Sequence, residues 1–301
     1  MDLSYLLRTT ILLLFWLICQ PQQCAVGGEL FLRQGAGGVI GFHTIRADDS
    51  LVELARHYDV GYNEITAANP DVDPYIPEVG TTVTIPGRWI LPDVPLRKGI
   101  VINVAEMRLY YFTPRTRGVI DTFPVGIGDE GWETPVGTYR IVEKMANPAW
   151  HVPASIRAQK PELPEIVPPG SNNPLGSHAL RLSIGTVLIH GTDRPFGIGR
   201  RVSHGCIHLY PEDIVTLFRK VKLGDRVTIV RQRAKAAVVN GRVLVEFHDD
   251  GGNGLEQEAI SLLERKGLIA RVDSGQLKAA IRRKSGMPED VTKRKCVTDL
   301  W

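Results

Sequence analysis

One cysteine and three histidines lie close together in the middle of the chain. Cys206 ends the run Ser-His-Gly-Cys, and His190 lies sixteen residues upstream, directly after a short apolar run. A thiol is a strong nucleophile as its thiolate, and a nearby imidazole can accept its proton. The two groups must be neighbours in space, which a strand end and a glycine-rich loop can arrange. These residue types indicate nucleophilic catalysis by Cys206 with His190 as its base.

Two other interpretations of these residues stay open. A lone cysteine is most often a small core residue, and a lone histidine is most often a satisfied hydrogen-bonding group. A zinc ion is the second alternative, because the segment holds four possible ligands: His190, His204, Cys206 and His208. The segment has no C-x₂₋₄-C pair, the spacing typical of structural zinc sites. The sequence therefore favours a site without a metal or an organic cofactor.

The residues around Cys206 resemble the signature of the L,D-transpeptidases, which have the YkuD-type catalytic domain. The resemblance rests on His190-Gly191 followed by Ser-His-Gly-Cys-Ile-x-Leu. It implies that Cys206 is the nucleophile, that His190 is the general base and proton donor, and that the Gly191 carbonyl orients the imidazole. Three further residues are expected to support the loop and the oxyanion: Ser203, His204 and Gly205.

One position departs from the family pattern. The family usually has Arg or Asn two residues after the cysteine, where this chain has His208. The resemblance implies a substrate-binding role at this position. An imidazole donates hydrogen bonds but carries a full charge only at lower pH. We therefore expect substrate recognition at His208 to differ in detail from the family pattern.

The likeness to the ErfK/YbiS branch of the family extends along most of the chain. It includes Asn103-Val-Ala-Glu-Met-Arg-Leu-Tyr-Tyr, Gly126-Ile-Gly, Thr134-Pro-x-Gly and Pro174-Leu-Gly. The implied reaction is acyl transfer on peptidoglycan: Cys206 attacks the bond before the terminal D-alanine of a tetrapeptide stem, and an amine resolves the thioester. The branch favours a Braun-type outer-membrane lipoprotein as acceptor. The alternatives are 3→3 cross-linking, hydrolysis, and a cell-wall-binding protein without catalysis.

Composition and the first residues indicate an exported protein. The chain of 301 residues is long enough for two or three domains, and its net charge of +3 is too small to indicate nucleic acid. Arg8 precedes the apolar run 11–19, which is too short to span a bilayer and typical of a signal peptide. We expect residues 1–25 to be this signal and the protein to be periplasmic. Cys206 and Cys296 then remain, and we expect a free thiol at Cys206.

Residues 42–87 show the pattern of a small module. A strand is predicted at 42–45, a helix begins after Ser50, a second helix covers 63–69, and a strand follows at 81–86. This β-α-α-β order resembles a LysM module, which binds N-acetylglucosamine-containing glycans such as peptidoglycan. The alternative is a spacer domain without a ligand.

The next part of the chain predicts a mainly β catalytic domain over 98–232. Residues 88–97 read as a proline-punctuated connector. Short β-rich runs follow at 100–104, 107–112, 119–125 and 134–141, with a helix at 211–218 and a closing strand at 223–230. The expected fold class is mainly β with short helices: a LysM-like module, a β-sandwich-like YkuD domain and a C-terminal extension.

Two segments carry weaker signals. Prolines recur through 143–175, which predicts a long ordered loop or lid with Trp150 and His151 lining a substrate groove; surface packing alone is the alternative. The C-terminal extension 233–301 shows a strand-like run at 238–245, a helix at 256–266 and a charged tail.

Overall fold

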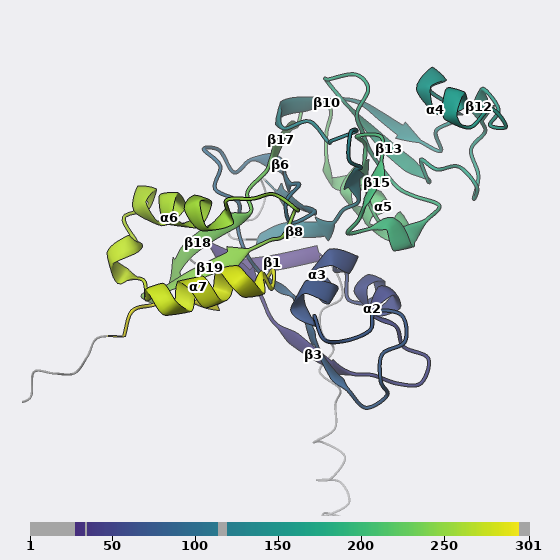
Figure 1. Cartoon of the computed structure of the whole chain (residues 1–301). Coiled ribbons are helices and arrows are strands. Elements are labelled where there is room, and N and C mark those ends of the chain that lie inside the picture. Colours follow the sequence, from purple (N-terminus) through teal and green to yellow (C-terminus); the bar gives the residue numbers. More distant parts are fainter. Residues whose placement is uncertain (1–27, 34, 114–118, 295–301) are drawn as a thin grey trace, which may run out of the picture.

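A sheet of eleven strands runs through the centre of the molecule (Figure 1). The computed structural model describes residues 28–33, 35–113 and 119–294, so the expected signal peptide and Cys296 lie outside the described residues. The strands follow one another in the sheet as β16 (Ile207–His208), β14 (Leu188–His190), β13 (His178–Leu182), β10 (Gly137–Ala146), β17 (Arg226–Val230), β6 (Gly99–Asn103), β7 (Arg108–Phe112), β8 (Val119–Pro124), β1 (Gly28–Arg33), β2 (Ala36–Gly38) and β5 (Arg88–Ile90). The described residues contain six short α-helices, which confirms the predicted mainly β class.

The central strands are buried on both faces. Every residue of β6 and β7 is buried. Side chains alternate along β6: Ile100 and Ile102 join a core cluster with helix α5 (Pro211–Lys220), whereas Val101 joins a cluster that contains Leu51. Strands covered on both sides read as nearly continuous apolar runs, which is why the sequence signalled them clearly.

The N-terminal module has the predicted β-α-α-β order. It comprises β3 (Gly41–Thr44), α2 (Leu51–His57), α3 (Tyr62–Ala68) and β4 (Thr82–Ile85), with β3 and β4 antiparallel. The Ser50 hydroxyl accepts a hydrogen bond from the Glu53 N–H and caps α2, as its position predicted. The apolar sides of α2 and α3 pack on the central sheet, so the module and the sheet share one core cluster.

A buried ion pair reinforces this shared core. Arg108 of β7 donates two hydrogen bonds of 2.7 Å to Glu64 of α3, and both side chains are almost fully buried. Trp89 donates to the same carboxylate at 2.8 Å, and its ring lies 4.0 Å from the Arg108 guanidinium. Trp89 belongs to β5, so the segment predicted as a connector instead begins with a strand of the sheet. The connector prediction failed because its apolar residues fill a core that the local pattern does not show.

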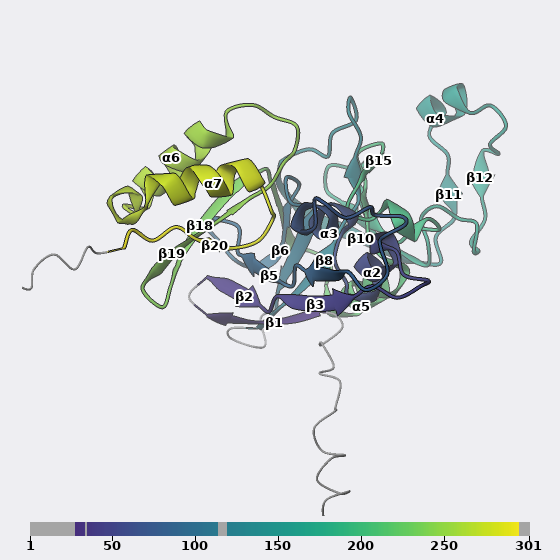
Figure 2. The ribbon, with the colours of Figure 1, turned by 60° about the horizontal axis from the view of Figure 1, so that its bottom comes forward.

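The proline-rich segment contains more regular structure than predicted. Strand β10 continues to Ala146, and the short helix α4 (Ala154–Gln159) lies between the paired strands β11 (Trp150–His151) and β12 (Ile166–Val167). Prolines stand before the helix and at its far side rather than within it, which is compatible with one and a half turns. Figures 1 and 2 both show this segment projecting outward from the sheet.

The C-terminal unit (residues 234–294) has its own core. The predicted single strand is a hairpin of β18 (Ala234–Val239) and β19 (Arg242–Phe247), whose turn Asn240-Gly241 has positive φ at both residues. β20 (Glu289–Asp290) pairs with β19, and α6 (Leu255–Arg265) and α7 (Ser274–Arg283) cover one face (Figure 2). Helix α7 lies where only a charged tail was predicted, and its Leu277 and Ala280 are buried in the core of this unit.

Candidate active site

The sheet brings Cys206 next to the strand that carries His190. Strands β14 and β16 are parallel, and their register pairs His190 with His208. Cys206 immediately precedes β16, and its thiol donates to the Thr186 carbonyl at 3.9 Å, just before β14 begins. Among the described residues the thiol makes no hydrogen bond to His190. Catalytic hydrogen bonds are often long before substrate binds, so the geometry is that of a resting site.

His190 is held in one tautomer. Its imidazole is buried, and Nδ1 lies 2.6 Å from the Gly191 carbonyl oxygen. Because a carbonyl only accepts hydrogen bonds, Nδ1 carries the proton and Nε2 presents a lone pair. Burial lowers the pKa of His190 to about 4, although the Gly191 carbonyl raises it. The imidazole is therefore neutral near pH 7 and able to accept a proton at Nε2.

A second imidazole lies against the first. The ring centroids of His190 and His208 are 4.4 Å apart, with planes inclined at 53°. Burial, together with the neighbouring His190, lowers the pKa of His208 well below its ordinary value. Both backbone groups of His208 are hydrogen-bonded to Gly126 at 2.9 Å, which fixes this residue beside the base. The residue that departs from the family pattern thus contacts the predicted base.

The thiol of Cys206 is also neutral at rest. Burial raises the pKa of Cys206, while the Leu188 N–H and the positive charge of Arg181 lower it. With a neutral thiol beside a neutral imidazole, the site holds no preformed thiolate–imidazolium pair.

A tight turn presents the cysteine. The Ser203 hydroxyl accepts from the Gly205 N–H at 3.2 Å and donates to the Cys206 carbonyl at 2.6 Å. Gly205 has φ of +99°, a conformation that favours glycine. The Ser203 hydroxyl therefore bridges two backbone groups of this turn. The sequence predicts that Gly205 helps to bind the oxyanion, but its N–H already donates a hydrogen bond to the Ser203 hydroxyl.

Thr134 also contacts this turn, and sequence reasoning gave it no role. Its buried hydroxyl accepts from the Gly128 N–H at 2.9 Å and donates to the Gly205 carbonyl at 3.1 Å. The only signal was the Thr-Pro-x-Gly run, which the resemblance included without indicating a contact. Thr134 and Gly205 lie 71 positions apart, so their contact is a product of the fold.

The remaining predicted residues lie further out. His204 is exposed, and its ring meets the edge of Trp132 at 4.8 Å between centroids. Trp150 is half-buried and His151 exposed in the projecting segment, and among the described residues neither has a hydrogen bond or ring contact with Cys206. The base of that segment does reach the site: a Cβ on Gly176 would lie 3.0 Å from the Gly191 backbone.

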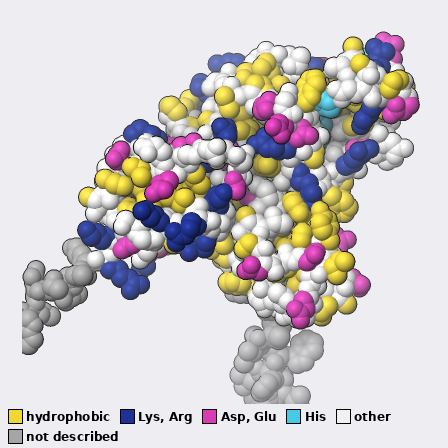
Figure 3. Space-filling model, in the orientation of Figure 1, with side chains coloured by type: hydrophobic (Ala, Val, Ile, Leu, Met, Phe, Trp, Pro, Cys, Tyr) yellow, Lys and Arg dark blue, Asp and Glu magenta, His cyan; other side chains and the backbone are white. Residues whose placement is uncertain are grey.

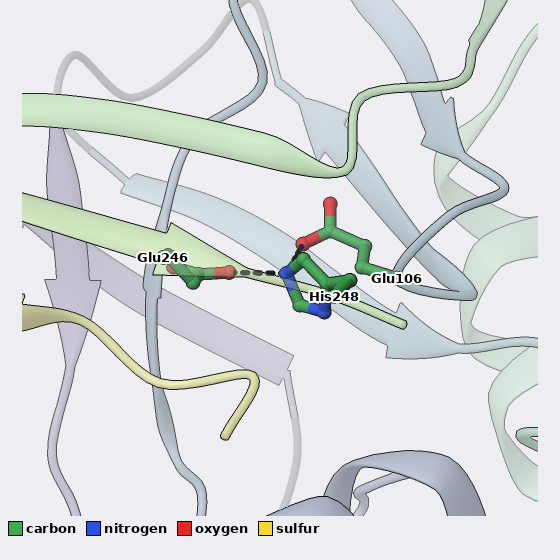
Figure 4. Close-up of side chains that lie close together, drawn as sticks. All are labelled: Glu106, Glu246 and His248. Carbon is green, nitrogen blue, oxygen red and sulfur yellow. Dashed lines mark hydrogen bonds and ion pairs between the residues drawn. The ribbon is translucent and has the colours of Figure 1, made fainter. Parts of the chain in front are cut away.

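The described residues contain one group with metal-ligand geometry, and it lies elsewhere. Glu106, Glu246 and His248 converge at the junction between the sheet and the C-terminal unit (Figure 4). The Lys235 ammonium lies 2.6 Å from Glu246 and also contacts Glu106, so a cation of the chain itself already occupies this position. The four residues of the zinc alternative do not form such a group.

Comparison with known proteins gives two family matches and several close relatives. Residues 97–229 match the L,D-transpeptidase catalytic domain, and residues 43–86 match the LysM domain. The chain is 43% identical over 267 residues to the probable L,D-transpeptidase YcfS of Escherichia coli, covering 83% of each chain. It is 40% identical over 253 residues to the probable L,D-transpeptidase YbiS of the same organism, covering 79% of this chain and 82% of that one.

A solved structure is similar at lower identity. The L,D-transpeptidase from Mycobacterium smegmatis aligns with a TM-score of 0.35 and 21% identity, over 50% of this chain and 64% of that chain. The described residues also include no helix that is both long and apolar enough to span a membrane.

Proposed function

Because this chain belongs to the L,D-transpeptidase family, we propose that Cys206 and His190 carry out its acyl transfer. Sγ attacks the carbonyl carbon that precedes the terminal D-alanine of a tetrapeptide stem, and Nε2 of His190 takes the thiol proton. The tetrahedral intermediate collapses as the C–N bond breaks, and His190 returns the proton to the departing amine. An acceptor amine then attacks the thioester, gives its proton to His190, and the thiolate leaves and is reprotonated.

The observation that carries this proposal is the fixed tautomer of His190. The Gly191 carbonyl holds the proton on Nδ1, so Nε2 is the basic nitrogen. Burial keeps the ring neutral, with a pKa of about 4. A base of this kind accepts a proton in the transition state and releases it readily to the leaving amine. Because β14 and β16 are parallel neighbours, His190 at the end of β14 lies on the strand next to the one that Cys206 precedes.

We propose peptidoglycan as the substrate and the periplasm as the compartment. The family match supports peptide stems, and the LysM match supports binding of the glycan strand. Apolar side chains gather on the surface of the N-terminal module (Figure 3), among them the exposed Phe42, Tyr75 and Ile76. Such side chains suit the apolar faces of sugar rings. The division proposed for the chain is signal peptide 1–25, LysM-like module 42–87, catalytic domain 98–232 and C-terminal extension 233–301.

We propose a Braun-type lipoprotein as the acceptor. This choice is supported by the identity of 40% or more to the YcfS, YbiS and ErfK/SrfK relatives over about four fifths of the chain. The donor half-reaction is the same for 3→3 cross-linking and for hydrolysis. The acceptor therefore decides the physiological product.

A muropeptide assay separates the acceptors. Purified protein is incubated with tetrapeptide muropeptides, with and without a lipoprotein whose C-terminus is lysine, and products are identified by mass spectrometry. We expect release of D-alanine and a new isopeptide bond to the lipoprotein, both absent in Cys206→Ala. If stem dimers are the only new products, the proposed lipoprotein anchoring is wrong and the enzyme makes 3→3 cross-links. If stems are shortened and no new bond forms, the enzyme is a hydrolase.

A further inference from the structure

The peptide group between Gly205 and Cys206 is bound from outside its own loop. Its oxygen, the Gly205 carbonyl, accepts the hydrogen bond from the Thr134 hydroxyl at 3.1 Å. Thr134 lies in the turn between β9 (Ile127–Gly128) and β10, on a different part of the chain from the nucleophile. The hydroxyl proton is directed to this carbonyl because the oxygen lone pair is taken by the Gly128 N–H at 2.9 Å.

The backbone N–H groups around Cys206 differ in whether they already have a hydrogen-bond acceptor. The Gly205 N–H donates to Ser203 at 3.2 Å, and the Ile207 and His208 backbones belong to the sheet. Within the described part of the chain, the Cys206 N–H donates to no protein acceptor. Acyl-transfer enzymes commonly use the nucleophile's own backbone N–H to bind the developing oxyanion. The Cys206 N–H is therefore the donor available for this task.

Peptide geometry couples the two observations. A trans peptide group is planar, and its C=O and N–H point in opposite directions. Fixing the Gly205 oxygen toward Thr134 therefore fixes the Cys206 N–H away from Thr134. Gly205 has φ of +99° and no Cβ, so its own conformation restrains this peptide weakly. The Thr134 hydrogen bond holds the oxygen of this peptide directly, whereas Ser203 bonds to the backbone groups on either side of it.

The support behind Thr134 is rigid. Its side chain is only 6% exposed, and Gly128 pairs with Ser203 across β9 and β15 (Arg201–Ser203). A Cβ on Gly128 would lie 2.0 Å from the Trp132 carbonyl, so the turn closes tightly on a glycine. The hydroxyl is thereby anchored to the same strand pair that leads into the nucleophile turn.

We propose that Thr134 is a positioning residue that aims the Cys206 N–H at the oxyanion, an inference that rests on the proposed acyl transfer at Cys206. The residue touches no substrate and acts through the Gly205 carbonyl. Its effect belongs to carbonyl chemistry, because only attack on a carbonyl generates an oxyanion. Displacement of a halide by the same sulfur needs no such donor.

The test compares two electrophiles on the full exported protein. Acylation of Cys206 by meropenem passes through an oxyanion, whereas alkylation by iodoacetamide does not, and both are followed by intact-mass spectrometry. Deleting an oxyanion donor typically lowers a rate 10²–10³-fold. Since Thr134→Val leaves the donor present but unaimed, we expect a smaller loss in acylation of about 10- to 100-fold, with alkylation within about twofold of wild type.

Two further variants complete the test. Thr134→Ser keeps the hydroxyl and is expected to recover most of the acylation rate. Thr216→Val removes an exposed side-chain hydrogen bond on α5 and serves as the matched control. Equal acylation of Thr134→Val and wild type, or an equal loss in acylation and alkylation, would overturn the positioning role. Wild-type protein that forms no meropenem adduct at Cys206 would overturn the proposed function itself.

Discussion

At the scale of single residues, burial decides the protonation state of the reacting pair. Burial lowers the pKa of the His190 imidazole and raises the pKa of the Cys206 thiol, so each is held in its neutral form. A cysteine enzyme with a preformed ion pair would react with any electrophile at neutral pH. The raised pKa of Cys206 instead keeps this sulfur as a thiol at neutral pH.

The pH dependence of alkylation follows from these directions. The pKa of Cys206 lies above its ordinary value of 9.0, so the thiolate fraction in the free enzyme is small at neutral pH. We expect the rate of iodoacetamide alkylation to climb steadily from pH 6 to pH 9 without a plateau. Mass spectrometry across this range measures it, with Cys206→Ala as the blank. A plateau beginning near pH 5 would instead show a thiolate–imidazolium pair.

The sequence predicts a nucleophile and its base but not their surroundings. Cys206, His190 and the glycines between them form a contiguous, readable signature. Two contacts around them could not be predicted: Thr134 with Gly205, and His190 with His208. No local sequence pattern indicates that the members of either pair are neighbours in space. Pairing of β14 with β16 brings the two histidines together, and pairing of β9 with β15 in a separate two-stranded sheet brings Thr134 to Gly205.

At the scale of elements, the N-terminal module is attached by a buried ion pair between α3 and β7. The Glu64 carboxylate receives both guanidinium hydrogen bonds and the Trp89 indole, which satisfies a charge taken out of water. Removing one partner of such a pair leaves the other charged and unpaired in the core. The pair therefore specifies where α3 sits on the sheet.

Arg108→Met is expected to lower the free energy of unfolding by about 3–5 kcal/mol, because it strands the Glu64 carboxylate. Urea unfolding followed by tryptophan fluorescence measures the change. Arg242→Met, which breaks the exposed pair with Asp290, is the control and is expected to cost less than about 1 kcal/mol. Equal effects of the two variants would mean that the Glu64 contact contributes no more than a surface pair.

At the scale of the whole molecule, separate sequence units form a continuous structure. The module and the sheet share a core cluster, and the C-terminal unit joins them through Lys235 and its two carboxylates. A second junction lies between the module and α5, where the buried carboxyl groups of Asp59 and Asp213 lie close enough to shift each other's pKa. One carboxyl oxygen of each, Asp59 Oδ1 and Asp213 Oδ2, has no hydrogen-bond partner among the described residues, so this junction favours a neutral carboxyl group.

This junction makes stability depend on pH. Burial raises the pKa of Asp59 to about 6 and raises that of Asp213 well above its ordinary value. Arg108 lowers both pKa values and Glu212 raises both, whereas Glu64 raises only that of Asp59. A raised carboxyl pKa means that the folded state binds the proton more tightly than the unfolded state. The stabilisation is complete below the ordinary value of 3.8 and is lost as the pH rises through the folded pKa values.

Asp213→Asn tests this at the level of the whole chain. The amide donates to Asp59 without needing a proton from solvent, so the variant is expected to lose less stability than wild type between pH 4 and pH 7. Parallel urea titrations at several pH values give the difference in the free energy of unfolding. Identical pH slopes for the two proteins would exclude a shared proton at this junction.

The sequence by itself determined the family signature, the predicted nucleophile and base, the β-α-α-β order of the module and five strands of the central sheet, β6, β7, β8, β10 and β17. Each of these depends on a short stretch of sequence: a motif, a helix cap or an apolar run. The tertiary structure alone decided the neutral state of His190 and Cys206 and the hydrogen bond from Thr134 to the Gly205 carbonyl. It also decided how the module packs on the sheet. These depend on burial and on contacts between distant segments, which come into being only when the chain folds.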